Sequence, residues 1–196
     1  MSIQSFENIL MERLNAAGSD KISDHQYQLA YKKFLVGKNV KSFLEIGIAN
    51  QVDGHSSITA WSELFPTATI YALDNDQKKV TMVNGGRVKA YNVDQSSLDS
   101  LLNFLDDADI KYIDVILDDG SHKFSHARTT FEVLFHHLSD DGIYMIEDIK
   151  KSSDTWQQSI RDWKNYLDAY DDLEYEIIDC RPGIDDDSII VGIWKK

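Results

Sequence analysis

The chain has few of the residues that mark several protein classes. Its 196 residues include one cysteine and two prolines, and no apolar run approaches the roughly 18 residues of a membrane span. The lone Cys180 excludes a disulfide within the chain and predicts a reducing, cytoplasmic location. The stretch from Met1 to Gly18 carries acids and lacks the basic and apolar regions of a signal peptide, so we expect no signal peptide.

Basic residues are also scarce. The chain has 20 Lys and Arg against 33 Asp and Glu, and its net charge is -13 at pH 7. Sequence-independent nucleic-acid binding relies on basic side chains that neutralise phosphates, so we expect no nucleic-acid partner and no membrane partner. A hydrophobic fraction of 42% with 27% charged residues is typical of a globular protein. We expect one domain over 1–196, with an N-terminal helical segment over 1–38 and a core over 39–196.

Apolar strands and amphipathic helices alternate along the chain. Repeated strand–helix units give parallel crossovers, so we expect a Rossmann-like three-layer α/β sandwich with a mostly parallel seven-stranded sheet. The short connection between the last two strands predicts an antiparallel C-terminal edge. The expected strands are 41–47, 69–74, 88–93, 112–118, 142–149, 173–179 and 188–194. The expected helices are 3–17, 24–36 with Asp24 as its cap, 56–65, 77–83, 96–105, 125–138 and 156–170.

Acids follow two of the predicted strands. The stretch YIDVILDDGSH ends a buried strand in two carboxylates, a glycine and a histidine, and the run GIYMIEDI ends in Glu147 and Asp148. Ligands of open α/β sheets bind outside the carboxyl ends of the strands. Neighbouring carboxylates repel one another, and a divalent cation such as Mg²⁺ relieves that repulsion. Asp119, Glu147 and Asp148 are therefore candidate metal ligands.

His122 lies three residues after Asp119 and is a candidate general base, because an unperturbed imidazole titrates near pH 6.5. The same stretch has a simpler interpretation, in which Asp119 or Ser121 caps the next helix. The other histidines nearby are expected at the surface or in packing; they are His126, His136 and His137.

The first predicted strand and its loop read LEIGIANQVDGHSS. Glu45 lies near the strand end, and Gly47 permits a ligand to approach the backbone closely. A dinucleotide site would need G-x-G-x-x-G, but Ala49 and Val52 stand where further glycines belong. The loop therefore favours a smaller ligand with an amino-acid tail and one adenosine, unless Gly47 serves only a tight turn.

Polar side chains also end the second and third predicted strands. Asp74 is placed to accept hydrogen bonds from both ribose hydroxyls of an adenosine. Asp94 and Gln95 lie where an adenine edge would be read, although a plain loop is an alternative. The candidate cofactor-binding residues are thus Glu45, Gly47, Asp74, Asp94, Gln95 and Asp118.

Together these motifs resemble the metal-dependent sugar O-methyltransferases that tailor macrolide and polycyclic antibiotics, within the class I S-adenosylmethionine-dependent methyltransferases. The resemblance rests on LEIG, the acid ending the second strand, VDQSS, ILDDGSH, IEDI and the segment SDKISDHQYQLAYKKFL, over about residues 18–150. The loop between Gly47 and Trp61 is longer than the family pattern. The resemblance implies S-adenosylmethionine and Mg²⁺ as cofactors, with Asp119, Glu147 and Asp148 on the metal, His122 as base, Asp74 at the ribose and Gly47 under the methionine.

We therefore expect an O-methyltransferase acting on a hydroxyl of a sugar-like small molecule, with a homo-oligomer compatible with the sequence. Three alternatives remain: an Fe(II)-dependent hydroxylase-like enzyme, an NAD-dependent oxidoreductase, and a non-catalytic adenosine-binding protein. The aromatic residues near the C-terminus are interpreted as core, interface or acceptor lid; they are Trp156, Trp163, Tyr166 and Tyr170.

Overall fold

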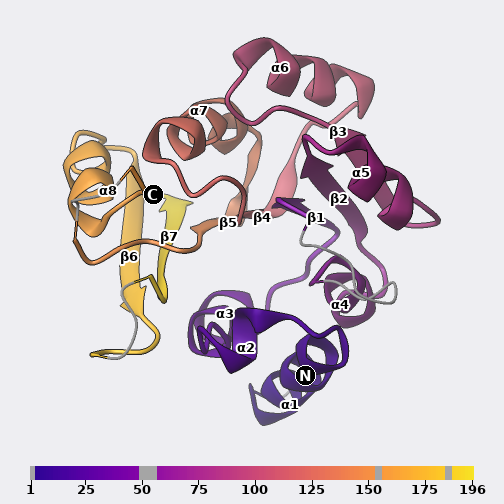
Figure 1. Ribbon diagram of the computed structural model, residues 1–196, viewed down its shortest axis with the longest axis horizontal. Helices are drawn as coiled ribbons and strands as arrows, with labels where there is room; N and C mark the ends of the chain where they lie inside the picture. Colours follow the sequence, from indigo (N-terminus) through magenta and orange to yellow (C-terminus); the bar gives the residue numbers. More distant parts are fainter. Residues whose placement is uncertain (1–2, 49–56, 153–155, 184–186) are drawn as a thin grey trace.

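The computed structural model describes residues 3–48, 57–152, 156–183 and 187–196 (Figure 1). Across these residues seven strands form one sheet in the order β3-β2-β1-β4-β5-β7-β6. The strands are β1 (Ser42–Ile46), β2 (Thr69–Asp74), β3 (Val88–Asn92), β4 (Ile113–Asp118), β5 (Leu138–Ile146), β6 (Leu173–Asp179) and β7 (Ile189–Lys195). The helices are α1 (Ile3–Ala16), α2 (Asp20–Ser23), α3 (Gln28–Leu35), α4 (Ser57–Leu64), α5 (Gln77–Val83), α6 (Leu98–Asp107), α7 (Phe124–Leu134), the 3₁₀ turn η1 (Phe135–His137) and α8 (Ile160–Leu167).

The strand directions confirm the predicted fold class. Strands β1 to β5 pair in parallel, whereas β7 runs antiparallel to both β5 and β6. The order reverses at β1, because the chain builds β2 and β3 on one side of it and β4 and β5 on the other. Such a switch point leaves a crevice at the carboxyl ends of the strands, where ligands of open α/β sheets bind.

Both faces of the sheet are covered by helices. Successive strand residues point to opposite faces, so Phe43 packs with one hydrophobic cluster and Leu44 with the other. In Figure 1 helices α1 to α4 gather on one side of the sheet, and α6 to α8 lie on the other. Trp61 of α4 and Trp163 of α8 are fully buried, one in each cluster. The result is the three-layer sandwich that the sequence predicts.

The N-terminal segment differs from its prediction in one consequential place. The helix expected over 24–36 is present as α3, but its start and its cap are wrong: α3 begins at Gln28, and Asp24 instead follows the end of a further short helix, α2. Ser19 caps α2 instead, accepting a hydrogen bond from the Lys21 amide. Gln26 has φ of +56°, outside the helical region, and so separates α2 from α3. Lys21 in α2 and Tyr27 just before α3 are both buried.

The C-terminal third differs mainly in element boundaries. Strand β5 begins at Leu138, before the expected turn, and an irregularity in its pairing with β4 accommodates the extra residues. Helix α8 begins only at Ile160, after the Ser159 cap, instead of at Trp156. The long loop expected after Gly47 falls on residues 49–56, outside the described residues. No helix within the described ranges is long and apolar enough to cross a membrane.

Candidate functional site

A cavity of about 490 Å³ lies at the carboxyl ends of β1, β2, β4 and β5. The structure brings most of the predicted site residues to its wall. The lining includes Gly47, Asp74, Asp94, Gln95, Asp119, His122, Glu147 and Asp148. Two predicted cofactor residues, Glu45 and Asp118, do not line it and lie behind the wall, where each is fully or almost fully buried.

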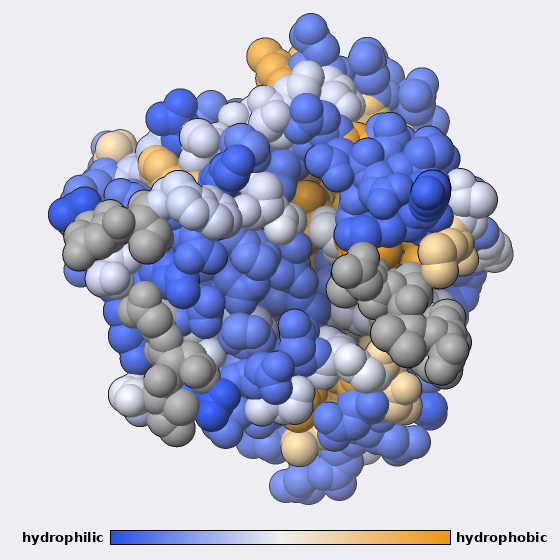
Figure 2. Space-filling view, viewed as in Figure 1, coloured by the Kyte–Doolittle hydropathy of each residue, from blue (hydrophilic) through white to orange (hydrophobic). Residues whose placement is uncertain are grey.

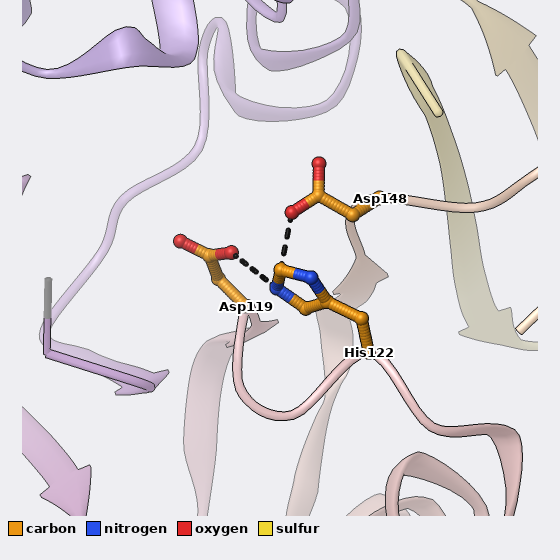
Figure 3. A group of neighbouring side chains, drawn as sticks. All are labelled: Asp119, His122 and Asp148. Atoms are coloured by element: carbon orange, nitrogen blue, oxygen red, sulfur yellow. Dashed lines mark hydrogen bonds and ion pairs between the residues drawn. The ribbon is translucent and has the colours of Figure 1, made fainter. Parts of the chain in front are cut away.

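His122 lies between two carboxylates (Figure 3). Its Nε2 atom is 3.3 Å from Asp119 Oδ1 and 3.0 Å from Asp148 Oδ2. Each of these three residues offers a ligand atom, and the three atoms lie within 4.8 Å of one another. The backbones of His122 and Asp148 both adopt left-handed φ values, +56° and +54°. Such strain in non-glycine residues persists only where the surrounding structure holds it, and it clusters at functional sites.

The electrostatics of this group favour an imidazolium in the metal-free protein. Burial opposes the charge on His122, but the hydrogen bond with Asp119 and the charges of Asp148 and Asp119 outweigh it and raise the pKa of His122 to about 9. Burial likewise opposes ionisation of Asp119, yet Lys21 and His122 lower the pKa of Asp119 to about 2. Asp119 is therefore ionised across the physiological range.

Glu147 lies beside that group, and two protein donors hold its carboxylate. Lys21 donates to Glu147 Oε2 and also to Asp119 Oδ2, and the Tyr31 hydroxyl donates to Glu147 Oε1. Burial raises the pKa of Glu147 to about 8 against the lowering effect of Lys21. Both oxygens of this predicted metal ligand are thus occupied by protein donors.

Residues near α2 and α3 contact the remaining acids. The Tyr27 hydroxyl donates to Asp148 Oδ1 at 2.6 Å. The Lys21 Nζ atom lies 3.7 Å from Glu45 Oε1, which also accepts a hydrogen bond from the Ser57 hydroxyl. Burial raises the pKa of Glu45 to about 7. The N-terminal segment therefore supplies a donor to each carboxylate of the cluster.

The other half of the cavity centres on Gly47 and Asp74. Gly47 has φ of +94°, and its backbone abuts the Asp119 carbonyl. Asp74 Oδ2 accepts the amide of Ile48 at 2.8 Å, and Oδ1 accepts the amide of Asp76 at 2.8 Å. These bonds hold the ends of β1 and β2 together and leave further lone pairs on the carboxylate for a ligand.

Asp118 supports Gln95, which does line the cavity. The Gln95 amide donates to Asp118, and Asp118 Oδ2 also accepts the Thr130 hydroxyl at 2.6 Å. The Gln95 carbonyl accepts the Ser121 amide at 2.5 Å, so Gln95 joins the third strand end to the loop before His122. Asp94 accepts from the amide and hydroxyl of Ser96 and thereby shapes its own loop.

The sequence did not single out several of these residues. Lys21 lines the cavity, although nothing local distinguishes it from a surface lysine. Tyr27 was expected on a buried helix face and is buried, but its hydrogen bond to Asp148 was not expected. His126 lines the cavity and contacts the Ser121 hydroxyl at 2.9 Å, whereas it was expected at the surface or in packing. The ILDDGSH motif is the one signal that could have pointed to His126, which follows it closely.

Comparisons with known proteins find relatives among methyltransferases. No protein-family model matches the chain. A rhamnosyl tetracenomycin-C 2'-O-methyltransferase from Streptomyces olivaceus is 32% identical over 160 residues, which are 79% of this chain and 39% of that protein. The mycinamicin VI 2''-O-methyltransferase from Micromonospora griseorubida is 36% identical over 111 residues, 54% of this chain and 26% of that protein. The chain thus spans about two-fifths or less of the length of these curated relatives.

Among solved structures, the MycE methyltransferase of mycinamycin biosynthesis, in complex with Mg, S-adenosylhomocysteine and mycinamycin VI, superposes with a TM-score of 0.76. The match covers 95% of this chain and 53% of that one at 22% identity, so it speaks for the fold. The chain is therefore similar in sequence to parts of sugar O-methyltransferases, and it shares its fold with the MycE methyltransferase.

Proposed function

We propose that the protein is an S-adenosylmethionine-dependent O-methyltransferase that uses a divalent metal and acts on a hydroxyl of a sugar-like small molecule. The observation that carries the proposal is the position of His122 between Asp119 and Asp148, in the same cavity as Gly47 and Asp74. A base, a cation site and an adenosine-sized pocket together are what this chemistry requires. The similarity to sugar O-methyltransferases supports the same reaction.

The half of the cavity around Gly47 fits S-adenosylmethionine. A side chain at Gly47 would collide with the Asp119 backbone, so only glycine leaves the strand end open to an amino-acid tail. Asp74, at the end of β2, would accept the ribose hydroxyls, and Gln95 and Asp94 would border the adenine. Asp118 positions Gln95. The cofactor supplies an electrophilic methyl group on a sulfonium.

The acid half fits Mg²⁺. Asp119 and Asp148 offer hard carboxylate oxygens from two neighbouring strand ends, and Glu147 lies beside them. We propose these three residues as the ligand set. A bound Mg²⁺ supplies positive charge that makes a nearby hydroxyl more acidic.

Asp119 and Asp148 keep His122 protonated in the metal-free protein, and a cation bound to these two carboxylates would offset their charge and lower the pKa of the ring. Neutral His122 would then take the proton from the attacked hydroxyl at Nε2. Asp119 and Asp148 hold the ring in place by contacts to that same atom and stabilise the imidazolium that results. The left-handed backbone of His122 sets the direction of the ring into the cavity. Much of the acceleration would come from the fixed geometry of hydroxyl and methyl donor.

The acceptor would approach from the side of Trp156. This residue is 67% exposed, and the ammonium of Lys123, which lines the cavity, lies 5.8 Å from its ring centroid. Of the other C-terminal aromatics, Trp163 is core and Tyr170 is partly exposed. Figure 2 shows a largely hydrophilic face with hydrophobic residues in separate groups, which suits a small polar acceptor.

The net negative charge of the chain supports the proposal that it has no nucleic-acid partner.

The two alternative enzymes, an Fe(II)-dependent hydroxylase and an NAD-dependent oxidoreductase, are less well supported. An Fe(II) oxygenase commonly uses two histidines and one carboxylate, whereas the candidate group among the described residues has one histidine and two carboxylates. An NAD enzyme would need further glycines after Gly47. A cytoplasmic location and a homo-oligomeric state remain predictions.

The proposal is tested by incubating the protein with methyl-labelled S-adenosylmethionine, Mg²⁺ and a panel of sugars that carry adjacent hydroxyls. Label should appear in a product, and a chelator should abolish it. The His122→Ala variant should lose about 10²- to 10⁴-fold in rate while still binding the cofactor. Full methyl transfer by a folded His122→Ala variant would overturn the assigned role.

A further inference from the structure

Lys21 is a buried cation in the middle of the acid cluster. The residue is 3% exposed, and its Nζ atom contacts Asp119 Oδ2 at 2.5 Å, the neighbouring Glu147 carboxylate, and Glu45 at 3.7 Å. An ammonium that loses its water must regain the lost interactions from the protein, and here three carboxylates supply them. Lys21 therefore neutralises acids that would otherwise repel one another.

Two of these carboxylates belong to the proposed metal ligands. Asp119 divides its oxygens, with Oδ1 toward His122 and Oδ2 toward Lys21. Both oxygens of Glu147 are held by protein donors, Lys21 and Tyr31. In this arrangement the ammonium therefore occupies the oxygen atoms that a cation bound by Asp119 and Glu147 would need.

We propose that Lys21 is a built-in counter-ion that holds Asp119 and Glu147 in the metal-free protein and competes with the divalent cation for them. When the cation binds, Lys21 gives up these oxygens, and Glu147 joins Asp119 and Asp148 in the ligand set. The inference deepens the proposed function by naming the residue that sets the metal affinity of the site. It predicts that metal binding is weaker than the acids alone would make it.

The competition also gives α2 a role in the site. Lys21 is the second residue of this four-residue helix, which Ser19 caps. The helix places the ammonium against strand ends that lie far away in the sequence, at Asp119 and Glu147. The N-terminal segment would thus tune the metal site as well as cover the sheet.

The test measures Mn²⁺ binding to the chelator-treated full chain by electron paramagnetic resonance of free Mn²⁺, without cofactor or acceptor. The Lys21→Met variant keeps the length of the side chain and removes its charge. Because a nearby positive charge opposes cation binding, the Kd for Mn²⁺ should fall at least about tenfold. Lys33→Met is the matched control, since it makes the same change of net charge at an exposed ion pair with Glu176 and should leave the Kd unchanged.

The inference would be overturned if a folded Lys21→Met variant bound Mn²⁺ with the same Kd as the parent or with a higher one. If this variant is unfolded without metal, Mn²⁺ should restore its circular dichroism spectrum, since the metal then neutralises the same acids. Failure to recover at saturating Mn²⁺ would also overturn it. Methyl transfer is not part of the readout, so an inactive but metal-binding protein would sink the proposed function and leave the role of Lys21 standing.

Discussion

A Cβ atom on Gly47 would lie 2.1 Å from the backbone carbonyl oxygen of Asp119. The two residues follow β1 and β4, which pair in parallel, so their loops leave the sheet side by side. One loop borders the proposed cofactor half of the cavity, and the other carries the acid and the histidine. The close approach therefore links the methyl donor to the groups that would activate its acceptor.

Replacing Gly47 with alanine should lower the stability of the protein and also prevent cofactor binding. The new methyl group meets backbone, which cannot move aside cheaply, and φ of +94° is strained for any residue with a side chain. We expect a loss of several kcal/mol in unfolding free energy, of the order of overpacking plus backbone strain, and no measurable cofactor binding.

Thermal unfolding and calorimetry of the Gly47→Ala variant measure these two effects. Gly37→Ala is the control, because Gly37 also has positive φ, at +81°, but nothing lies within 4 Å of its added Cβ. The unfolding free energy of the control should fall by only about 1 kcal/mol, and the control should bind the cofactor normally. If Gly47→Ala and Gly37→Ala changed stability and cofactor binding equally, the close approach of Gly47 to the Asp119 carbonyl would not matter.

The Asp74→Asn variant tests the ribose contact. An amide keeps the size of the side chain but offers one acceptor oxygen in place of two, so the proposed bonds to the ribose hydroxyls weaken. We expect S-adenosylmethionine affinity to fall about tenfold, a loss of about 1.4 kcal/mol. Asp76→Asn, at the helix cap two residues later, is the control and should leave affinity and stability nearly unchanged, because asparagine caps a helix about as well as aspartate. Unchanged affinity in Asp74→Asn would remove this residue from the cofactor site.

The raised pKa of His122 predicts a pH dependence of stability in the metal-free protein. Its pKa is about 9 in the folded protein and about 6.5 when unfolded. The contribution of the imidazolium to stability is therefore fully present below about pH 6.5 and is lost as pH rises through about 9. Because the side chain is partly exposed, we expect at most about 3 kcal/mol.

Urea unfolding of the parent and the His122→Gln variant between pH 6 and 10 isolates this contribution. Glu45 and Glu147 also titrate in this range, and the parent–variant difference removes most of their effect. The stability advantage of the parent should shrink as the pH rises. An advantage that stays constant or grows would show that the imidazole gains no proton affinity on folding.

Trp156 is the test of the acceptor side. The Trp156→Ala variant should raise the KM for the identified acceptor several-fold, with kcat and cofactor binding nearly unchanged, because the ring would contact the acceptor and does not line the cavity that would hold the cofactor. Tyr112→Ala is the matched control, since Tyr112 is an aromatic of similar exposure, 68%, that precedes the start of β4, at the opposite end of the strand from the cavity. A matching rise in KM in the control, or none in Trp156→Ala, would move the acceptor elsewhere.

Strand ends were the predictable part of the site. Hydrophobic runs define the buried strands, and strands of a parallel sheet deliver their last residues to one edge. For this reason Asp74, Asp119 and Glu147 could be assigned to one cavity from sequence alone. The same reasoning placed Glu45 and Asp118 there, but an alternating strand also turns side chains behind the wall, and both residues lie there.

The contribution of the N-terminal segment could not be predicted in this way. Its local pattern favours a helix that starts at Asp24, whereas a short helix ends at Ser23 and the left-handed Gln26 precedes the start of α3 at Gln28. The contacts of Lys21 and Tyr27 join residues more than 90 positions apart in the chain. No periodicity encodes such contacts, because they follow from packing of the segment against the completed sheet.

The most direct test of the account is calorimetric titration of the purified protein with S-adenosylmethionine, with and without Mg²⁺. We expect binding of micromolar strength, about -8 kcal/mol, in at least the presence of Mg²⁺. Absence of binding to both S-adenosylmethionine and its demethylated product, under both conditions, would contradict the assignment as a methyltransferase.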